Sequence, residues 1–369
     1  MNTSASHRLG LVVGKFSPLH LGHEHVIGRA QQACEQVLVL GYSQPSFPGC
    51  ERARREAWVQ RRFPGVINLQ IDDDWVRARC AERGLPWRPM PDNLASDEAQ
   101  QDWLAWLLDG PIGLRPDAMF ASEPYLGPTC ERLARTWAQP VTPVSVDPHR
   151  ARHPISARTL RQDVHAHRTW LHADVYRDFV QRVVLLGGES SGKTTLAEAL
   201  AHAEGTVWVP EHGRDRWLAC GGQLTLQDLV DIAHTQVAHE EARLSQAHRW
   251  LVCDTSPLTT WGYAGWMFQQ QPPELTQAAM RRYDLIVLCE PDFGFVQDGT
   301  RRGADFQREQ HAWYEAQLLE RSEPVLRVGG PLAQRVAQVQ AALAELSQRG
   351  VQPGDPAEPP DPPDPPEPS

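Results

Sequence analysis

The sequence lacks several features that would place it in a specialised class of protein. Its seven cysteines are an odd number, are scattered over 369 residues, and include no C-x-x-C pair. A disulfide scaffold and a structural zinc site are therefore disfavoured, and a reducing compartment is favoured. No apolar run approaches the ~18 residues of a membrane helix, and residues 1–8 lack the apolar core of a secretory signal. These absences predict a soluble cytoplasmic protein without a membrane segment.

Length and charge set two further limits. A chain of 369 residues suits two domains, each with its own core. Asp and Glu number 46 against 36 Lys and Arg, which gives a net charge of −10. An acidic protein is not an obvious nucleic-acid binder. Residues 351–369 hold five acids, nine prolines and no base, so we expect this tail to be disordered.

The strongest motif lies in the second half of the chain. Residues 187–195 read GGESSGKTT and fit G-x-x-x-x-G-K-[ST], with an apolar run before them and a helix-forming run after them. Such a loop turns several backbone N–H groups toward a phosphate at a helix N-terminus. Lys193 is expected to reach the β- and γ-phosphates of ATP, and Thr194 to bind Mg²⁺. The predicted ATP-binding residues are Gly187, Gly188, Glu189, Ser190, Ser191, Gly192, Lys193, Thr194 and Thr195.

The rest of this half favours a P-loop kinase that acts on a small molecule. Residues 250–254 are apolar and end in Asp254, as in a Walker B strand, which places Asp254 near Mg²⁺. Glu211 follows a strand-like segment and is our first choice for the base that accepts a substrate hydroxyl proton, with Asp254 as the runner-up. Residues 298–303 are basic and glycine-flanked. We expect them to form a lid that brings Arg301 and Arg302 over the phosphate, with a solvated surface loop as the alternative.

The first half begins with the pattern of a doubly wound α/β domain. Residues 9–14 and 37–41 predict buried strands on either side of a helix at 22–35. The turn after the first strand holds Lys15, His20 and His23, at the strand end where ligands bind in such sheets. Two histidines three residues apart can converge on one anion. A metal site that includes His25 is the alternative. Further strands are predicted at 66–71, 118–123 and 141–146, and helices at 52–63 and 97–108.

Two segments of this half resemble the signatures of nucleotidyltransferases. The turn has Gly14, Phe16, Pro18, His20, Gly22 and His23 in the places of the (H/T)xGH signature, and residues 155–161 read ISARTLR, similar to ISxTxxR. The resemblance implies that His20 and His23 stabilise the α-phosphate of ATP. It also implies ATP binding by Gly14, Lys15, Phe16, Gly22, Ser156, Thr159 and Arg161. From the residues alone, 155–161 is a helix start capped by Ser156.

Together the two halves resemble the NadR-type bifunctional enzymes, which join a nicotinamide-mononucleotide adenylyltransferase to a ribosylnicotinamide kinase. The kinase resemblance rests on residues 187–195, EHGRD at 211–215, DTSPLTT at 254–260 and DGTR at 298–301, with His212 and Ser256 in place of more usual residues. It implies that nicotinamide riboside and ATP give nicotinamide mononucleotide in the second domain. The mononucleotide and ATP then give NAD and pyrophosphate in the first, with Mg²⁺ as cofactor. Some members carry an N-terminal helix-turn-helix; the first strand here begins near Leu9, so no DNA binding is expected.

The expected fold class is therefore α/β in four segments. These are a Rossmann-like nucleotidyltransferase domain at 1–170, a short connector at 171–181, a P-loop kinase domain at 182–348 and a disordered tail at 349–369. Trp103 and Trp106 share a helix face and are candidates to stack on a substrate ring, with core packing as the default. Two alternatives stay open: the same chemistry on another nucleoside, and an ATP- or NAD-binding sensor with weak turnover. The oligomeric state is also open, a homo-oligomer included.

Overall fold

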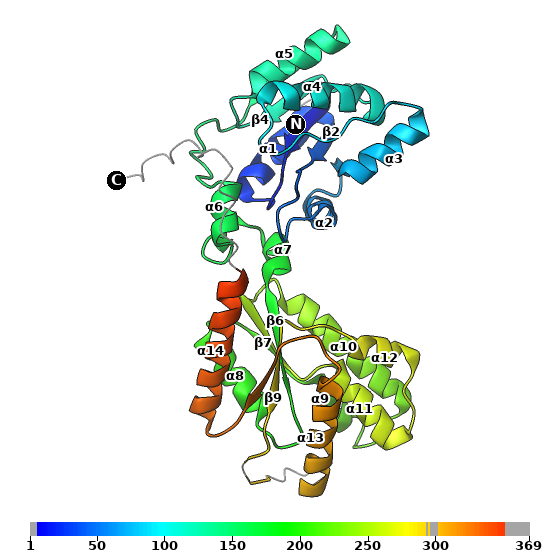
Figure 1. Ribbon diagram of the computed structural model, residues 1–369, viewed down its shortest axis with the longest axis vertical. Coiled ribbons are helices and arrows are strands. Elements are labelled where there is room, and N and C mark those ends of the chain that lie inside the picture. Colours follow the sequence, from blue (N-terminus) through cyan, green and yellow to red (C-terminus); the bar gives the residue numbers. More distant parts are fainter. Residues whose placement is uncertain (1–5, 293, 296–301, 351–369) are drawn as a thin grey trace, which may run out of the picture. The chain divides into compact units, whose positions relative to one another are not determined.

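The fold consists of two compact α/β units, each built on its own parallel sheet (Figure 1). The computed structural model describes residues 6–292, 294–295 and 302–350. The described chain divides between Tyr176 and Arg177. The α/β fold class expected from the sequence is confirmed. The tail at 351–369 and lid residues 298–301 lie outside the described residues, so those two predictions stay predictions.

The sheet of the first unit has five parallel strands in the order β3-β2-β1-β4-β5. This is a doubly wound order, and it reverses direction at β1, so a ligand crevice is expected where β1 and β4 end. Every strand predicted for this half is present, within a few residues of its expected bounds. The strands are β1 (His7–Gly14), β2 (Cys34–Gly41), β3 (Ile67–Gln70), β4 (Ala118–Ala121) and β5 (Thr142–Ser145).

Helices and short helical turns connect these strands. The helices at 52–62 and 97–107 match their predicted bounds closely, whereas α3 and α5 were not predicted. The elements are α1 (Leu21–Ala33), α2 (Arg52–Arg62), α3 (Asp73–Arg83), α4 (Asp97–Leu107), η1 (Leu108–Ile112), α5 (Leu126–Trp137), α6 (Ala157–Gln162), η2 (Arg168–Trp170) and α7 (Ala173–Tyr176).

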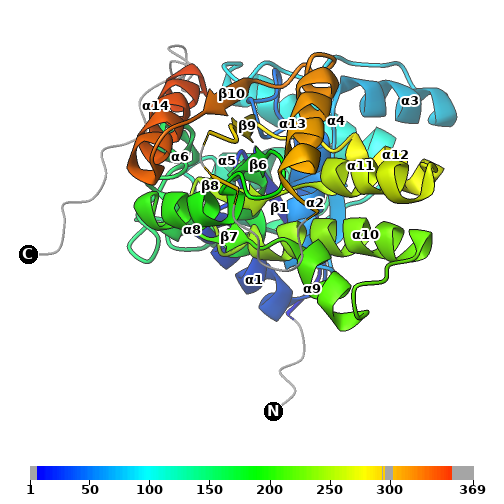
Figure 2. The same cartoon turned by 90° about the horizontal axis from the view of Figure 1, so that it is seen from below.

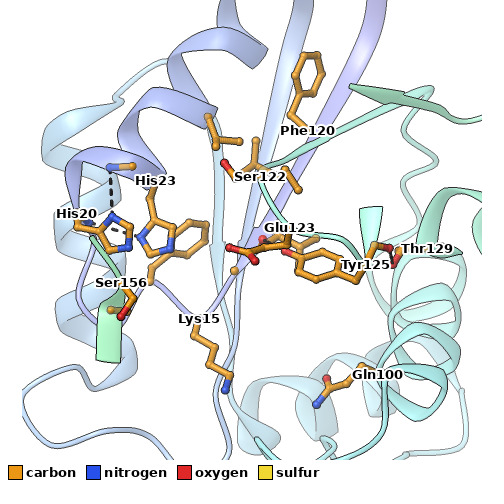
Figure 3. Close-up of a pocket in the computed structure, with 18 of the residues that line it drawn as sticks. Lys15, His20, His23, Gln100, Phe120, Ser122, Glu123, Tyr125, Thr129 and Ser156 are labelled. Atoms are coloured by element: carbon orange, nitrogen blue, oxygen red, sulfur yellow. Dashed lines mark hydrogen bonds between the residues drawn. The ribbon is translucent and has the colours of Figure 1, made fainter. Parts of the chain in front are cut away.

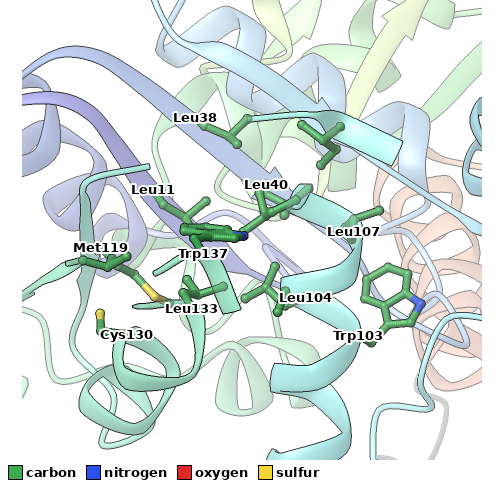
Figure 4. Close-up of a cluster of buried hydrophobic side chains, with 14 of the residues drawn as sticks. Leu11, Leu38, Leu40, Trp103, Leu104, Leu107, Met119, Cys130, Leu133 and Trp137 are labelled. Atoms are coloured by element: carbon green, nitrogen blue, oxygen red, sulfur yellow. The ribbon is translucent and has the colours of Figure 1, made fainter. Parts of the chain in front are cut away.

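A single hydrophobic cluster fixes α4 and α5 to one face of this sheet (Figure 4). Strand residues Leu11 and Leu38 pack there against Leu104 of α4 and Leu133 of α5, all with at most 3% of their surface exposed. Burial of such side chains stabilises the unit by about 1.5–3 kcal/mol each. The cluster therefore holds in place the ends of β1 and β4, which border the crevice.

The second unit repeats the plan with the strand order β10-β9-β6-β8-β7. Figures 1 and 2 show α8 and α14 on one face of the sheet and α10, α11 and α13 on the other. The strands are β6 (Gln181–Leu186), β7 (Trp208–Val209), β8 (Trp250–Asp254), β9 (Leu285–Cys289) and β10 (Val325–Val328). The helical elements are η3 (Arg177–Phe179), α8 (Lys193–Ala203), α9 (His212–Ala219), α10 (Leu226–Arg243), α11 (Pro257–Phe268), α12 (Pro273–Ala279), α13 (Ala304–Leu318) and α14 (Leu332–Gly350).

As expected from the sequence, Glu211 follows a short strand, β7, and it directly precedes helix α9. Within the described ranges, no helix has the length and apolar character needed to cross a membrane.

Two candidate nucleotide sites

A cavity of about 450 Å³ opens where β1 and β4 end, in the first unit (Figure 3). The turn after β1 contributes Lys15, His20 and His23 to its lining. The segment before and within α6 contributes Ser156, Arg158 and Arg161. The fold thus brings two signatures that lie far apart in the sequence to one cavity.

The local fold of the turn holds the two histidines side by side. His20 is the N-cap of α1, and its Nδ1 accepts the Gly22 N–H at 3.1 Å. The His20 N–H in turn donates to His23 Nδ1 at 3.4 Å. The two rings stack at a centroid distance of 3.7 Å, and Phe16 packs edge-on against His23. A Cβ at Gly22 would lie 3.0 Å from the His20 ring, so a larger residue there would crowd the histidine.

This arrangement defines which histidine nitrogens can act on a ligand. Because both Nδ1 atoms accept backbone N–H groups, the neutral rings carry their proton on Nε2. Burial, and then His23 and Arg150, holds the pKa of His20 well below its usual range. Burial, and then Arg150, lowers the pKa of His23 to about 3. Both rings are therefore neutral at pH 7, and each carries one N–H; that of His23 bonds the Pro18 carbonyl, which an anion would replace.

A metal site at these histidines finds no support in the structure. Among the residues described, no group of three or more His, Cys, Asp or Glu side chains is arranged to hold a metal ion. His25 pairs instead with His153, at a ring distance of 5.7 Å.

The Arg161 side chain connects the segment at 155–161 to the turn that carries the two histidines. Arg161 donates from Nη1 to the Ser17 carbonyl at 2.8 Å, and its guanidinium lies 3.8 Å from the centroid of the Phe47 ring. The Lys15 ammonium lies over the same ring at 5.7 Å. Ser156 caps α6 as predicted, and its hydroxyl lies 3.0 Å from that of Thr159. Thr159 is not part of the cavity lining.

The structure corrects the proposal that Trp103 and Trp106 stack on a substrate ring. Trp103 is 5% exposed and packs in the hydrophobic cluster, with its ring 4.9 Å from Tyr42. Trp106 is half-buried against the same cluster and lies under the Arg88 guanidinium. Neither lines the cavity, because α4 turns this face toward the sheet. The default interpretation, core packing, is the one the structure shows.

A second cavity, of about 740 Å³, surrounds the P-loop in the second unit. Residues 189–195 line it together with Gly187. Gly187 has a φ of 145°, and a side chain there would lie 2.8 Å from the Cys289 carbonyl oxygen. The Lys193 ammonium donates to the carbonyls of Gly187 and Gly188, at 3.0 Å each. The loop is thus closed around its lysine at the start of α8.

Of the residues predicted for Mg²⁺ and for the proton acceptor, Thr194 and Glu211 line this cavity, and the buried Asp254 lies behind Thr194. Thr194 Oγ1 donates to Asp254 Oδ2 at 2.6 Å, while Asp254 Oδ1 is buried without a hydrogen-bond partner in the described part of the chain. One hydroxyl and one carboxylate with a vacant oxygen suit a hard cation such as Mg²⁺. Burial, and then Asp254, raises the pKa of the Glu211 carboxyl; burial also raises the pKa of Asp254.

Glu189 connects the P-loop to two other elements. Its carboxylate accepts the Tyr263 hydroxyl and the Arg302 N–H, both at 2.8 Å. Arg302 lines the cavity, and its guanidinium lies 4.0 Å from the Phe306 ring centroid. Arg301, the other predicted lid arginine, lies outside the described residues.

Several lining residues were not identified from the sequence. The second cavity continues from the phosphate loop into an aromatic region formed by Trp217, Tyr263, Trp266 and Tyr314. In the first cavity, Gln100, Glu123, Tyr125, Arg150 and Arg158 were missed. The positions of Glu123 and Arg158, one just after a strand and one inside the second signature, were the available signals.

The two sites define a class of protein: a two-unit α/β protein with a P-loop site in one unit and a candidate nucleotide site at the strand ends of a doubly wound sheet in the other. Comparison with known families agrees, since residues 182–335 match the AAA domain family.

Two curated relatives are similar to this chain over most of its length. One is "Trifunctional NAD biosynthesis/regulator protein NadR" of Escherichia coli (strain K12), 28% identical over 344 residues that cover 85% of this chain and 76% of that protein. The protein of the same name from Salmonella typhimurium (strain LT2) is 28% identical over 321 residues, which cover 79% of this chain and 71% of that protein.

Solved structures share the fold along nearly the whole chain. A crystal structure of NadR protein in complex with NR has a TM-score of 0.65, 18% identity, and coverage of 91% of this chain and 96% of its own. A crystal structure of NadR protein in complex with NAD and AMP-PNP has a TM-score of 0.67, 18% identity, and coverage of 94% and 98%. The resemblance to the NadR-type proteins, inferred from motifs, is confirmed by the curated relatives: the chain is similar to proteins named NadR over most of its length.

Proposed function

We propose that this protein is a bifunctional enzyme of NAD salvage. The P-loop cavity phosphorylates nicotinamide riboside with ATP to nicotinamide mononucleotide. The cavity of the first unit joins that mononucleotide to ATP and yields NAD and pyrophosphate. The observation that carries the proposal is the presence of two cavities in separate units, each lined by its own phosphate-binding motif. The names of the curated relatives and the ligands of the related crystal structures support the choice of substrates.

In the kinase step, the riboside 5′-hydroxyl attacks the γ-phosphorus of ATP, and the bond from that phosphorus to the β–γ bridging oxygen breaks. Glu211 accepts the hydroxyl proton; its position in the cavity lining supports this role, and its raised pKa makes it a stronger base than an exposed carboxylate. Lys193 exchanges its two carbonyl partners for phosphate oxygens. Thr194 and Asp254 would hold Mg²⁺, which would neutralise charge on the β- and γ-phosphates when bound.

In the adenylyl step, a phosphate oxygen of the mononucleotide attacks the α-phosphorus of ATP, and pyrophosphate leaves. The attacking phosphate is already ionised, so no protein base is required. Positioning and charge neutralisation carry the rate. His20 and His23 donate their Nε2 protons as hydrogen bonds to the α-phosphate, and Lys15, Ser156 and Arg161 hold the leaving pyrophosphate.

A time course of the full-length protein tests the proposal. Nicotinamide riboside, ATP and Mg²⁺ are mixed with the protein, and products are identified by mass. We expect nicotinamide mononucleotide to appear first, followed by NAD and an equal amount of pyrophosphate. A parallel panel of purine and pyrimidine nucleosides tests the choice of nucleoside. Faster phosphorylation of any of these, with no NAD formed from the riboside, would refute the assignment.

A further inference from the structure

The first cavity contains an ion pair that neither signature accounts for. Arg150 Nη2 donates to Glu123 Oε1 at 2.9 Å, and both side chains line the cavity. The Arg150 and Glu123 side chains are 24% and 37% exposed, so a ligand in the cavity can reach both. Figure 3 shows the Glu123 side chain extended toward His23. A cation and an anion thus sit beside the two neutral histidines.

Arg150 lies in a loop that has a strained backbone and several hydrogen bonds. Arg150 has a φ of 48° and Asp147 a φ of 50°, both in the left-handed region that non-glycine residues rarely adopt. The Asp147 carboxylate accepts the N–H groups of Ala151 and Arg152, and the Arg150 N–H donates to the Asp147 carbonyl. Such strain persists where surrounding bonds enforce it, and it concentrates at functional sites.

Glu123 is fixed to the same region of the sheet. It follows Ser122, whose hydroxyl donates to the Val146 carbonyl at 2.6 Å. That bond joins the segment after β4, which carries Glu123, to the segment after β5, which carries Arg150. The pair therefore bridges the carboxyl ends of two neighbouring strands, at the same end of the sheet as the turn that carries His20 and His23.

We propose that Arg150 is a phosphate-binding residue of this cavity, and that Glu123 holds its guanidinium in the free protein until a nucleotide phosphate takes the place of the carboxylate. The inference rests on the proposed binding of nucleotides at this cavity. A guanidinium binds carboxylate and phosphate oxygens with the same forked geometry, so the two anions compete for it. Because His20 and His23 are neutral, Arg150 supplies a full positive charge beside them.

The competition predicts effects of opposite sign for the two partners. Removal of the Arg150 charge takes away a phosphate ligand and weakens binding. Removal of the Glu123 charge frees Arg150 and also removes a like charge from the approach of the phosphate, so it strengthens binding. A pair that served only to hold the loop would weaken binding when either partner was changed.

The test uses inorganic pyrophosphate as the probe and the imidazole NMR signals of His20 and His23 as the reporter. The full chain carries Lys193→Ala as a common background, so that the P-loop adds no second anion site. We expect Arg150→Gln to weaken pyrophosphate binding about tenfold and Glu123→Gln to strengthen it about threefold. In the double variant, the gain from Glu123→Gln should fall to the smaller part that comes from removing a like charge, because Arg150 is no longer there to be freed. Arg152→Gln is the matched control, since it removes the same charge from an exposed position of the same loop outside the cavity lining.

Each outcome decides a separate question. If Glu123→Gln weakens binding, or its full gain survives in the double variant, the inference is wrong. If Arg152→Gln weakens binding as much as Arg150→Gln, net charge explains the effect and the inference is again wrong. If pyrophosphate leaves both histidine signals of the parent unshifted, the proposed function of the cavity fails. In turnover assays, Arg150→Gln should raise the KM for ATP, for the mononucleotide or for both, and Arg150→Lys should restore part of it; unchanged KM values would also overturn the inference.

Discussion

Thr194 Oγ1 lies 2.6 Å from Asp254 Oδ2, and this hydrogen bond joins the P-loop to the end of β8. If these two oxygens hold Mg²⁺, the hydroxyl is essential and the methyl group of Thr194 is not. We expect Thr194→Val to lower the rate of riboside phosphorylation by about a hundredfold or more. Thr194→Ser, which keeps the hydroxyl, should retain most of the rate. Similar rates for the two variants at saturating ATP and Mg²⁺ would contradict this role.

Glu211 gives a pH prediction for the kinase step. Its pKa is raised by burial and by Asp254, and the base works only when deprotonated. Phosphorylation should therefore fall as the pH drops through this raised pKa, at a higher pH than an exposed carboxyl would cause. Glu211→Gln should lower kcat by about 10²–10⁴-fold and remove this acid limb.

The alternative base is tested by the same profile. If Glu211→Gln keeps both its rate and its acid limb, the proton acceptor is another group, and Asp254 is then the candidate. Synthesis of NAD from added mononucleotide serves as the internal control, since it needs no kinase step and should be unchanged in this variant.

The histidine pair predicts a loss of stability in mild acid. The pKa of His23 is about 3 in the folded protein, because the ring is buried and lies near Arg150; in the unfolded chain it is about 6.5. Below pH 6.5 the unfolded state binds a proton that the folded state does not, so stability falls progressively between about pH 6.5 and 3. His23→Asn should therefore lose less free energy of unfolding between pH 7 and 5 than the parent. His149→Asn, at an exposed position of the same unit, should follow the parent, and identical losses in all three proteins would contradict the argument.

Trp103 is expected to matter for stability and not for substrate contact. It is 5% exposed in the hydrophobic cluster of α4, α5 and the sheet. Trp103→Ala should lower the free energy of unfolding by about 3–5 kcal/mol, and Trp103→Phe should recover part of that loss. The KM for the mononucleotide should stay within about twofold of the parent value, because a core side chain makes no ligand contact. A large rise in KM in a variant of unchanged stability would restore the stacking role.

The motifs predicted from sequence are those in which local backbone geometry is part of the function. The turn at His20 and His23 and the loop at Gly187 and Gly192 each depend on residues that are close in sequence. The strands could also be predicted from the sequence, because both sheets are parallel and their central strands are continuously apolar. This is why both cavities could be located at strand ends before the structure was known.

The features that were missed depend on contacts between distant segments. The Arg150–Glu123 pair joins two strand ends, and the Glu189–Tyr263 bond joins the P-loop to α11. Neither contact produces a recognisable pattern in the local sequence. Helix α5 is different: its buried residues Leu126, Cys130, Leu133 and Trp137 recur at helical spacing, so its signal was present and was overlooked. Helix α3 buries only Val76 and Cys80, so its apolar face is too small to predict a helix.

The central claim is that one chain performs two ATP-using steps at separate sites, and a pair of single variants tests it most directly. Products are measured by mass, first with nicotinamide riboside and ATP and then with nicotinamide mononucleotide and ATP. Lys193→Ala should abolish mononucleotide formation from the riboside and leave NAD synthesis from added mononucleotide intact. His23→Ala should stop NAD synthesis while the mononucleotide accumulates from the riboside. Loss of both activities in either variant, with the protein still folded, would contradict the two-site account.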